Sequence, residues 1–171
     1  ELASNEKIRK ISFTGSTSVG KTLMEQAASS IKRISLQLGG NAPFLVFNNA
    51  DIDKAVAGAV AGKFRNTGQT CVSINRFYVQ EEVYEEFTKK LTKAVRELVV
   101  GDGLKKTSQV GPLINADGLK KVEEHVQDAI SKGAKLETGG KPMKGLFYEP
   151  TVLSNMPKDS IIATEETFGP I

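Results

Sequence analysis

The chain is poor in the residues that build metal clusters, disulfides and membrane spans. Its 171 residues include one cysteine, one histidine and no tryptophan. A single thiol cannot form an internal disulfide, and one histidine cannot supply a histidine-based metal cluster or catalytic dyad. No apolar run reaches the ~18 residues that span a bilayer, and no charged-then-apolar leader opens the chain. We therefore predict no metal site and no membrane association.

Charge of one sign is also scarce. The net charge is +3, and lysines are interleaved among glutamates. No basic stripe or aromatic platform is present, which argues against nucleic-acid binding. With 39% hydrophobic and 25% charged residues, the composition is typical of a soluble globular protein in a reducing compartment. The expected location is the cytoplasm, or the mitochondrial matrix in a eukaryote.

The length allows one full core, or one core and part of a second. Because the chain opens ELASNEK without Met and stops at FGPI on a turn, we expect an internal piece of a longer polypeptide.

The order of apolar patterns predicts an α/β fold. Period-two alternation indicates strands and 3.6-residue spacing indicates helices. Because the two kinds of segment alternate, we predict a largely parallel sheet with flanking helices. His125 lies among charges on the helix expected from Leu119 to Ile130 and is predicted to be solvated. The expected elements are a strand over 8–14, a helix from Thr17 that runs out at Ser29 and Ser30, strands over 33–38 and 43–47 joined by a glycine turn, a helix over 51–64 capped by Asp51, a buried strand over 74–80, helices with apolar stripes from Val83 to Leu98 and from Leu119 to Ile130, and short strands and turns from 135 onward.

Cys71 is the first candidate for chemistry. It ends the run FRNTGQTC, in which residues 66–70 are polar and turn-forming. A free cysteine is most often a small buried apolar residue. A polar turn instead presents the sulfur at the end of a loop, where catalytic groups concentrate. The pattern favours a nucleophilic thiol.

Residues 15–22, GSTSVGKT, fit the phosphate-binding P-loop pattern between a strand and a helix. In an NTPase, Lys21 would reach the terminal phosphates and Thr22 would hold magnesium. The acidic partner at another strand end is missing, since Asn48 and Asn49 occupy that place. Alternatively, the N–H groups at the helix start and Ser16 bind the pyrophosphate of a dinucleotide. A plain glycine turn before a helix is the third interpretation.

Two further positions carry polar groups of interest. Gln37 ends a strand before two glycines, where a side chain projects into a crevice beyond the sheet. An amide there orients water but cannot take its proton. Glu165 and Glu166 precede a turn that contains Phe168. This turn either aims a carboxylate and a ring outward or is simply acidic surface.

Four segments together resemble the aldehyde dehydrogenase superfamily along the full chain. FTGSTSVGK, LQLGGNAP, GQTC and EETFGPI match its motifs in order and spacing, and Gln37 and Cys71 are 71 − 37 = 34 positions apart, like the family's base and nucleophile. The resemblance implies an aldehyde dehydrogenase-like catalytic domain in which Cys71 is the nucleophile. It also implies that Glu166 and Phe168 hold the nicotinamide ribose and ring. The residues implied to lie against NAD or NADP are Gly15, Ser16, Thr17, Ser18, Val19 and Gly20.

KFRNTGQTC is similar to the succinate-semialdehyde dehydrogenases, in which the arginine matching Arg65 binds the distal carboxylate of the substrate. The other interpretation of Arg65 is a surface charge at a helix end. The resemblance implies NAD(P)-dependent oxidation of this small aldehyde to succinate through a cysteine thiohemiacetal and thioester. It further implies a homo-oligomer of the full-length protein. Residues 1–37 would be the C-terminal part of the NAD(P)-binding domain and 38–171 the catalytic domain, truncated at its C-terminus.

Two positions depart from the family pattern. Gln37 stands where the family has glutamate, which weakens the hydrolytic half-reaction. Ser73 stands where several succinate-semialdehyde dehydrogenases have a second cysteine that forms a redox switch. The alternatives are a dehydrogenase for another small carboxylated aldehyde, a hydrolysis-impaired paralogue or binding scaffold, and a P-loop NTPase. We expect the isolated segment to be inactive because its cofactor fold is incomplete.

Overall fold

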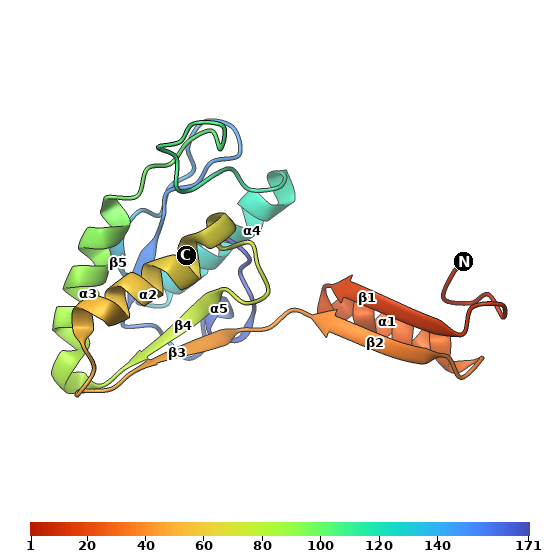
Figure 1. Ribbon diagram of the computed structural model, residues 1–171. Coiled ribbons are helices and arrows are strands. Elements are labelled where there is room, and N and C mark those ends of the chain that lie inside the picture. Colours follow the sequence, from red (N-terminus) through yellow and green to blue (C-terminus); the bar gives the residue numbers. More distant parts are fainter. The chain divides into compact units, whose positions relative to one another are not determined.

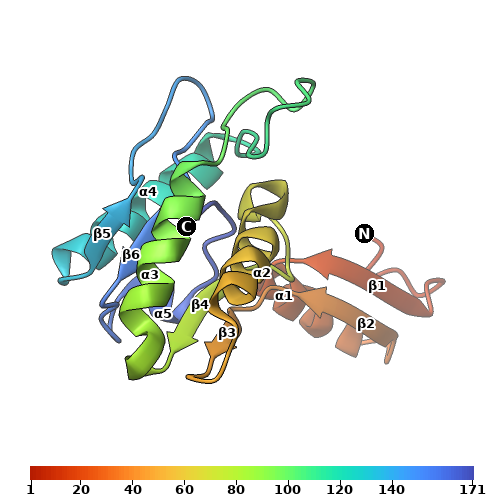
Figure 2. The same cartoon turned by 60° about the vertical axis from the view of Figure 1, so that its left-hand side comes forward.

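A computed structural model describes residues 1–171. The chain divides into two compact units, Glu1–Gly40 and Asn41–Ile171. Each unit combines a parallel strand pair with helices (Figures 1 and 2). This arrangement confirms the predicted α/β class. No helix has both the length and the apolar content to cross a bilayer.

The first unit is one strand–helix–strand motif. Strand β1 (Lys10–Gly15) pairs in parallel with β2 (Arg33–Leu38), and α1 (Thr17–Ala28) connects them. The helix lies against one face of the strand pair in both views (Figures 1 and 2). At Gly20 an added Cβ would come 2.6 Å from Leu38 Cδ2. The glycine therefore lets the helix lie close to β2.

The second unit begins with another parallel pair, β3 (Ala42–Val46) and β4 (Ile74–Val79), linked through α2 (Ile52–Phe64). Helix α3 (Glu81–Arg96) follows β4 and packs beside α2 (Figure 1). Apolar residues from all four elements bury one shared core. Its buried members are Val46, Ile52, Val56, Ala59, Phe64, Phe87, Leu91, Val95, Val110 and Val152.

Asp51 caps α2 as predicted, because its carboxylate accepts a hydrogen bond from the Lys54 N–H at 3.1 Å. The apolar stripe of α3 is also confirmed: Phe87, Leu91 and Val95 are fully buried. The Asp51 cap sets where α2 starts, and the apolar stripe sets which face of α3 packs against α2. Together they fix the position of α2, whose C-terminal end leads to Cys71.

A second core gathers around α4 (Ala116–Ser131). It contains residues of α4, of the following segment and of the C-terminal end of the chain. The short antiparallel pair β5 (Lys135–Thr138) and β6 (Val152–Ser154) lies next to α3, and α5 (Ile161–Thr164) packs on α4. The core residues are Leu113, Val122, Val126, Ala129, Ala134, Tyr148, Ile162 and Ile171.

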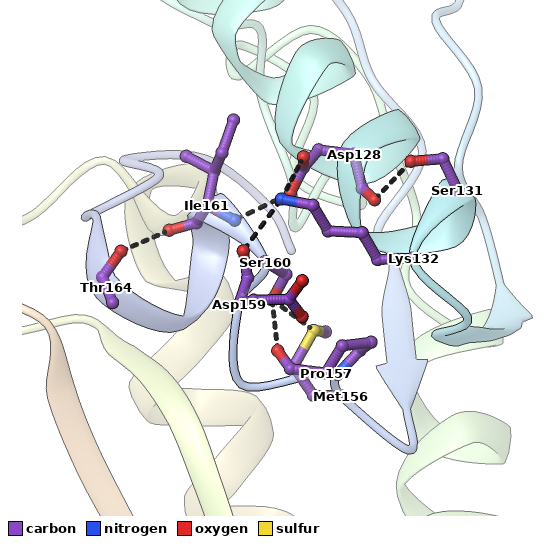
Figure 3. Close-up of polar contacts among 9 residues, drawn as sticks. All are labelled: Asp128, Ser131, Lys132, Met156, Pro157, Asp159, Ser160, Ile161 and Thr164. Carbon is purple, nitrogen blue, oxygen red and sulfur yellow. Dashed lines mark hydrogen bonds and ion pairs between the residues drawn. The ribbon is translucent and has the colours of Figure 1, made fainter.

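A polar brace joins α4 to α5 (Figure 3). The Asp128 carboxylate accepts a hydrogen bond from the Ile161 N–H at 2.7 Å and pairs with the Lys132 ammonium at 2.7 Å. Lys132 also donates to the Asp159 carbonyl oxygen at 2.8 Å. Because Ile161 starts α5, Asp128 satisfies an N–H group that has no partner within that helix. The brace fixes the segment that leads into the EETFGPI motif.

The strands expected around Gly39 and Gly40 are present as Arg33–Leu38 and Ala42–Val46, and they belong to different sheets. Two other expectations about the elements were wrong in detail. Most of β4 is half-buried rather than buried, and Tyr78 is exposed. Residues 161–164, expected in strands and turns, form α5. Apolar runs of this length are compatible with both helix and strand, and here packing on α4 selects the helix.

Candidate functional site

The Cys71 loop begins where α2 ends. A short 3-10 turn (Arg65–Gly68) follows the helix, and within it Asn66 and Thr67 have φ of 52° and 60°. Cys71 is exposed. The loop interpretation of this residue is therefore confirmed and the buried-core alternative is wrong. Positive φ at two successive non-glycine residues is strained, so the loop must be held by its surroundings.

Two side chains fasten this loop to residues 111–114. The Thr67 hydroxyl accepts from the Gly111 N–H at 2.9 Å and donates to the Gly111 carbonyl oxygen at 3.2 Å. Gln69 also bonds in both directions: its Oε1 accepts from the Ile114 N–H at 2.9 Å and its Nε2 donates to the Pro112 carbonyl oxygen at 3.2 Å. Donor and acceptor are satisfied on both sides, so these bonds hold the strained turn in one conformation.

Gly68 brings the Cys71 loop into backbone contact with the EETFGPI motif. Its φ is +70°, and an added Cβ would collide with the Gly169 carbonyl oxygen. The turn just before Gly169 carries Glu166 and Phe168. Phe168 is 41% exposed, with φ of 58°, and Glu166 Oε1 is buried without a hydrogen-bond partner. The structure therefore brings Cys71, Glu166 and Phe168 onto two abutting segments.

Lys63 is a buried charge beside this site that the sequence reasoning missed. The residue is 1% exposed, and its ammonium donates to Asn75 Oδ1 at 2.9 Å. Burial lowers the pKa of Lys63 to about 7, and the Glu166 carboxylate opposes this shift. The sequence does contain a signal for this burial, because Lys63 continues at helical spacing the buried stripe of Ile52, Val56 and Ala59 on α2.

Ser73, which stands where related sequences have a second cysteine, is also tied to α2. The residue is 1% exposed, and its hydroxyl donates to the Lys63 carbonyl oxygen at 3.2 Å. Lys63 therefore receives one bond from the chain after Cys71 and donates another to Asn75. Both bonds fix the start of β4 against the end of α2, on either side of the loop.

The prediction for His125 was wrong. The residue is 3% exposed, and its Nδ1 lies 3.0 Å from the Thr167 hydroxyl oxygen. Burial, together with the Lys121 charge, lowers the pKa of His125, so the imidazole is neutral at pH 7. His125 follows Val122 by three residues and precedes Ala129 by four, which places it on the buried face of α4. Its neighbours Glu123 and Glu124 are exposed.

The side chains of Arg65 and Gln37 are both exposed to solvent. Arg65 is exposed and takes part in none of the chain's ion pairs. Gln37 is exposed near the end of β2, opposite Thr14 on β1. A hollow of about 450 Å³ in the second unit is lined by Lys63 and Asn75 but not by Cys71.

The start of α1 carries hydroxyl and N–H groups of the kind that bind a phosphate. Ser16 caps the helix by accepting from the Val19 N–H at 3.4 Å, and the hydroxyls of Ser16 and Ser18 lie 3.1 Å apart. Helix geometry leaves the first N–H groups without intrahelical partners, and residues 16–19 are exposed. The Thr22 hydroxyl, which an NTPase would use for magnesium, donates to the Ser18 carbonyl oxygen at 3.3 Å. No group of three or more His, Cys, Asp or Glu side chains is placed to hold a metal ion.

The contact between Gly68 and Gly169 yields a stability prediction. Gly68→Ala should lower the free energy of unfolding by about 1–3 kcal/mol, because a Cβ meets backbone and φ is positive. Gly58→Ala is the matched control: it lies within α2, and the nearest atom to its Cβ is Phe44 Cζ at 4.0 Å. The control should gain about 0.4–1 kcal/mol. Urea unfolding measures both, and equal stability of the two variants would contradict the contact.

The sequence of this chain is similar to the sequences of known proteins. The sequence model of the aldehyde dehydrogenase family matches residues 1–171. The chain is 55% identical over 171 residues to a glutarate-semialdehyde dehydrogenase of Pseudomonas putida, covering 100% of this chain and 36% of that protein. It is also 55% identical over 173 residues to the Escherichia coli protein named succinate-semialdehyde dehydrogenase (NADP(+)) GabD, with the same coverage.

A solved structure agrees with these relatives. The crystal structure of succinate-semialdehyde dehydrogenase from Burkholderia pseudomallei matches with a TM-score of 0.96 and 55% identity, over 99% of this chain and 36% of that one. The chain thus spans 36% of the length of these relatives. Because the family match covers every residue and the motifs fall on the segments described above, the chain belongs to the aldehyde dehydrogenase family.

Proposed function

We propose that this chain is the central segment of an NAD(P)-dependent dehydrogenase that oxidises succinate semialdehyde to succinate. Residues 1–37 would end the cofactor domain and residues 38–171 would form the catalytic domain. The observation that carries the proposal is the exposed Cys71 thiol on a clamped loop that abuts the Glu166–Phe168 turn. The names of two 55% identical relatives support a small aldehyde that carries a carboxylate.

Cys71 acts as the nucleophile in this proposal. Its thiolate attacks the aldehyde carbon, so that a C–S bond forms and the carbonyl oxygen becomes an alkoxide. Collapse of the alkoxide with loss of a hydride, which bound NAD(P)⁺ would accept, would leave a thioester at that carbon. Water cleaves the C–S bond, which releases the carboxylic acid and the thiol. The rigid clamp by Thr67 and Gln69 supports this role, because a nucleophile must be held close to its attack geometry.

NAD(P)⁺ supplies the hydride acceptor. The structural environments of the residues that would hold it are consistent with this role. The capped start of α1, with Gly15 to Gly20, would hold the pyrophosphate through N–H groups and the Ser16 and Ser18 hydroxyls. In the second unit, the unpartnered buried oxygen of Glu166 would accept from ribose hydroxyls, and the half-exposed ring of Phe168 would lie against the nicotinamide.

Arg65 would bind the distal carboxylate of the substrate. It lies six positions before Cys71 on the same turn, is exposed and has no carboxylate partner within the chain. A guanidinium stays charged at every working pH and can donate two parallel bonds to a carboxylate. This pairing would favour succinate or glutarate semialdehyde over a neutral aldehyde.

Gln37 favours a second candidate, a hydrolysis-impaired paralogue. An amide accepts or donates a hydrogen bond but does not remove a proton from water, whereas the family's glutamate does. Acylation of Cys71 and hydride transfer need no water. The chain would then complete the first half of the reaction and accumulate the thioester.

The role of Arg65 is testable in the full-length protein. Arg65→Leu should raise KM for succinate semialdehyde roughly 10- to 150-fold, the equivalent of ~1.5–3 kcal/mol for a charge-assisted contact. KM for butyraldehyde, which lacks the carboxylate, should change little. Arg65→Lys should fall between, because it keeps the charge without the bidentate fork. Steady-state kinetics with both aldehydes measures these KM values. Equal KM changes for the two substrates would contradict the proposal that Arg65 determines specificity.

The role of Gln37 is tested by restoring the carboxylate. The full-length protein should show a burst of NAD(P)H followed by slow turnover, and Gln37→Glu should raise the steady rate by about 10²- to 10⁴-fold, with KM for the aldehyde little changed. Gln26→Glu on α1 introduces the same charge elsewhere in the first unit and should have no effect. Stopped-flow absorbance of NAD(P)H resolves both phases. Rapid turnover without a burst in the parent would show that Gln37 is not at the base position.

A further inference from the structure

The turn that carries Glu166 and Phe168 is strained and must be held from outside. Phe168 is a non-glycine residue with φ of 58°. A backbone of this kind is strained and persists only where neighbouring contacts impose it. After the turn, the Thr151 N–H donates to the Pro170 carbonyl oxygen at 2.8 Å. Before it, the Asp128 carboxylate holds the start of α5 (Figure 3). Within the turn itself, a different contact is needed.

Thr167 supplies that contact. It lies between Glu166 and Phe168 and is 2% exposed, whereas Phe168 is 41% exposed. Its hydroxyl lies 3.0 Å from His125 Nδ1 on α4, and both groups are buried. In a buried setting neither partner can replace this bond with water, so its loss leaves an unsatisfied polar group. Helix α4 therefore holds this segment at two points: its Asp128 bonds to the start of α5, and its His125 bonds to Thr167 in the turn.

We propose that His125 is a positioning residue for the cofactor: by holding Thr167, it sets the orientation of Glu166 and Phe168 toward the nicotinamide ribose and ring. This inference rests on the proposed function, because it assumes that the turn meets NAD(P). His125 does not touch the cofactor. The charged groups around it are Lys121, Glu124 and Asp128 on α4 and Glu165 in the turn. None of them bonds to the imidazole, which leaves Thr167 as its hydrogen-bond partner.

Two pairs of variants in the full-length protein separate the hydrogen bond from packing. His125→Asn places an amide near the position of Nδ1, whereas His125→Gln carries the same amide one carbon further out. Thr167→Val removes the hydroxyl at nearly constant volume, and Thr167→Ser keeps it. If the bond positions the turn, His125→Asn and Thr167→Ser should preserve function, whereas His125→Gln and Thr167→Val should impair it. The Thr167 pair keeps the test decisive if a His125 variant fails to fold.

The kinetic readout is KM for NADP⁺ set against kcat and KM for succinate semialdehyde. His125→Gln and Thr167→Val should raise KM for NADP⁺ roughly two- to tenfold, the factor for one net hydrogen bond. KM for the aldehyde should stay unchanged, because Cys71 and Arg65 belong to the other segment. His125→Asn and Thr167→Ser should stay within about twofold of the parent. The double variant His125→Gln/Thr167→Val should be no worse than either single variant, since both substitutions remove the same bond.

A second readout does not depend on activity. Hydrogen–deuterium exchange of residues 161–171, measured without cofactor, should be faster in His125→Gln and Thr167→Val than in the parent. Faster exchange together with the NADP⁺-specific KM change supports the inference. Unchanged exchange and unchanged KM overturn it and leave the roles of Cys71 and Arg65 intact. Faster exchange with unchanged KM for NADP⁺ overturns it too, because the turn would then not meet the cofactor.

The two readouts also separate failure of the inference from failure of the proposed function. If the parent protein neither reduces nor binds NAD⁺ or NADP⁺, the binding measured by calorimetry, the dehydrogenase proposal fails, and the cofactor role of His125 fails with it. If the parent is active, only the contrast between the paired variants decides on His125.

Discussion

The hydrogen bonds between the Thr67 hydroxyl and the backbone of Gly111 hold together the part of the molecule on which the chemistry depends. Thr67 has a left-handed backbone conformation, which a β-branched residue adopts only under constraint. The strain is tolerated because the hydroxyl is buried and satisfied in both directions. If this contact were lost, residues 66–70 would relax to ordinary turn conformations. Gly68 would then leave Gly169, and Cys71 would no longer stand beside the turn that carries Glu166 and Phe168.

Buried polar groups recur around this loop, and each of them ties together two segments that are distant in sequence. Lys63 joins α2 to β4 through Asn75, and His125 joins α4 to the turn through Thr167. Desolvation acts on both groups in the same direction, since it lowers both pKa values and favours the neutral forms. Such groups add little net stability compared with apolar residues of equal size. Their effect is to specify one arrangement of the site.

Much of the fold followed from patterns in the sequence. The stripe on α3, the Asp51 cap and the strand–helix alternation depend on local spacing, which the sequence states directly. The exposure of Cys71 also followed from its polar, turn-forming neighbours. The family and its motifs could be identified because four segments match in order. The roles assigned to Cys71, Gln37, Arg65, Glu166, Phe168 and residues 15–20 remain predictions.

The wrong predictions share a physical cause. His125 has charged neighbours in sequence, yet the 3.6-residue period places it on the same face as Val122 and Ala129. Lys63 fits an apolar stripe, but a lysine in the last turn of a helix is more often solvated. Residues 161–164 have an apolar run too short to distinguish helix from strand. In each case a contact with another segment determines the burial or the secondary structure, and local sequence patterns do not reveal such contacts.

The nature of the bond that forms at Cys71 tests the account most directly. The full-length protein is mixed with succinate semialdehyde and NADP⁺, quenched in acid within the first turnover, and digested for peptide mass spectrometry. We expect a succinyl group on the peptide that contains Cys71, in proportion to the NADPH formed, and neither signal in Cys71→Ser. NADPH formation by the Cys71→Ser variant, or by the parent with no acyl group on that peptide, would contradict a mechanism that begins at this thiol.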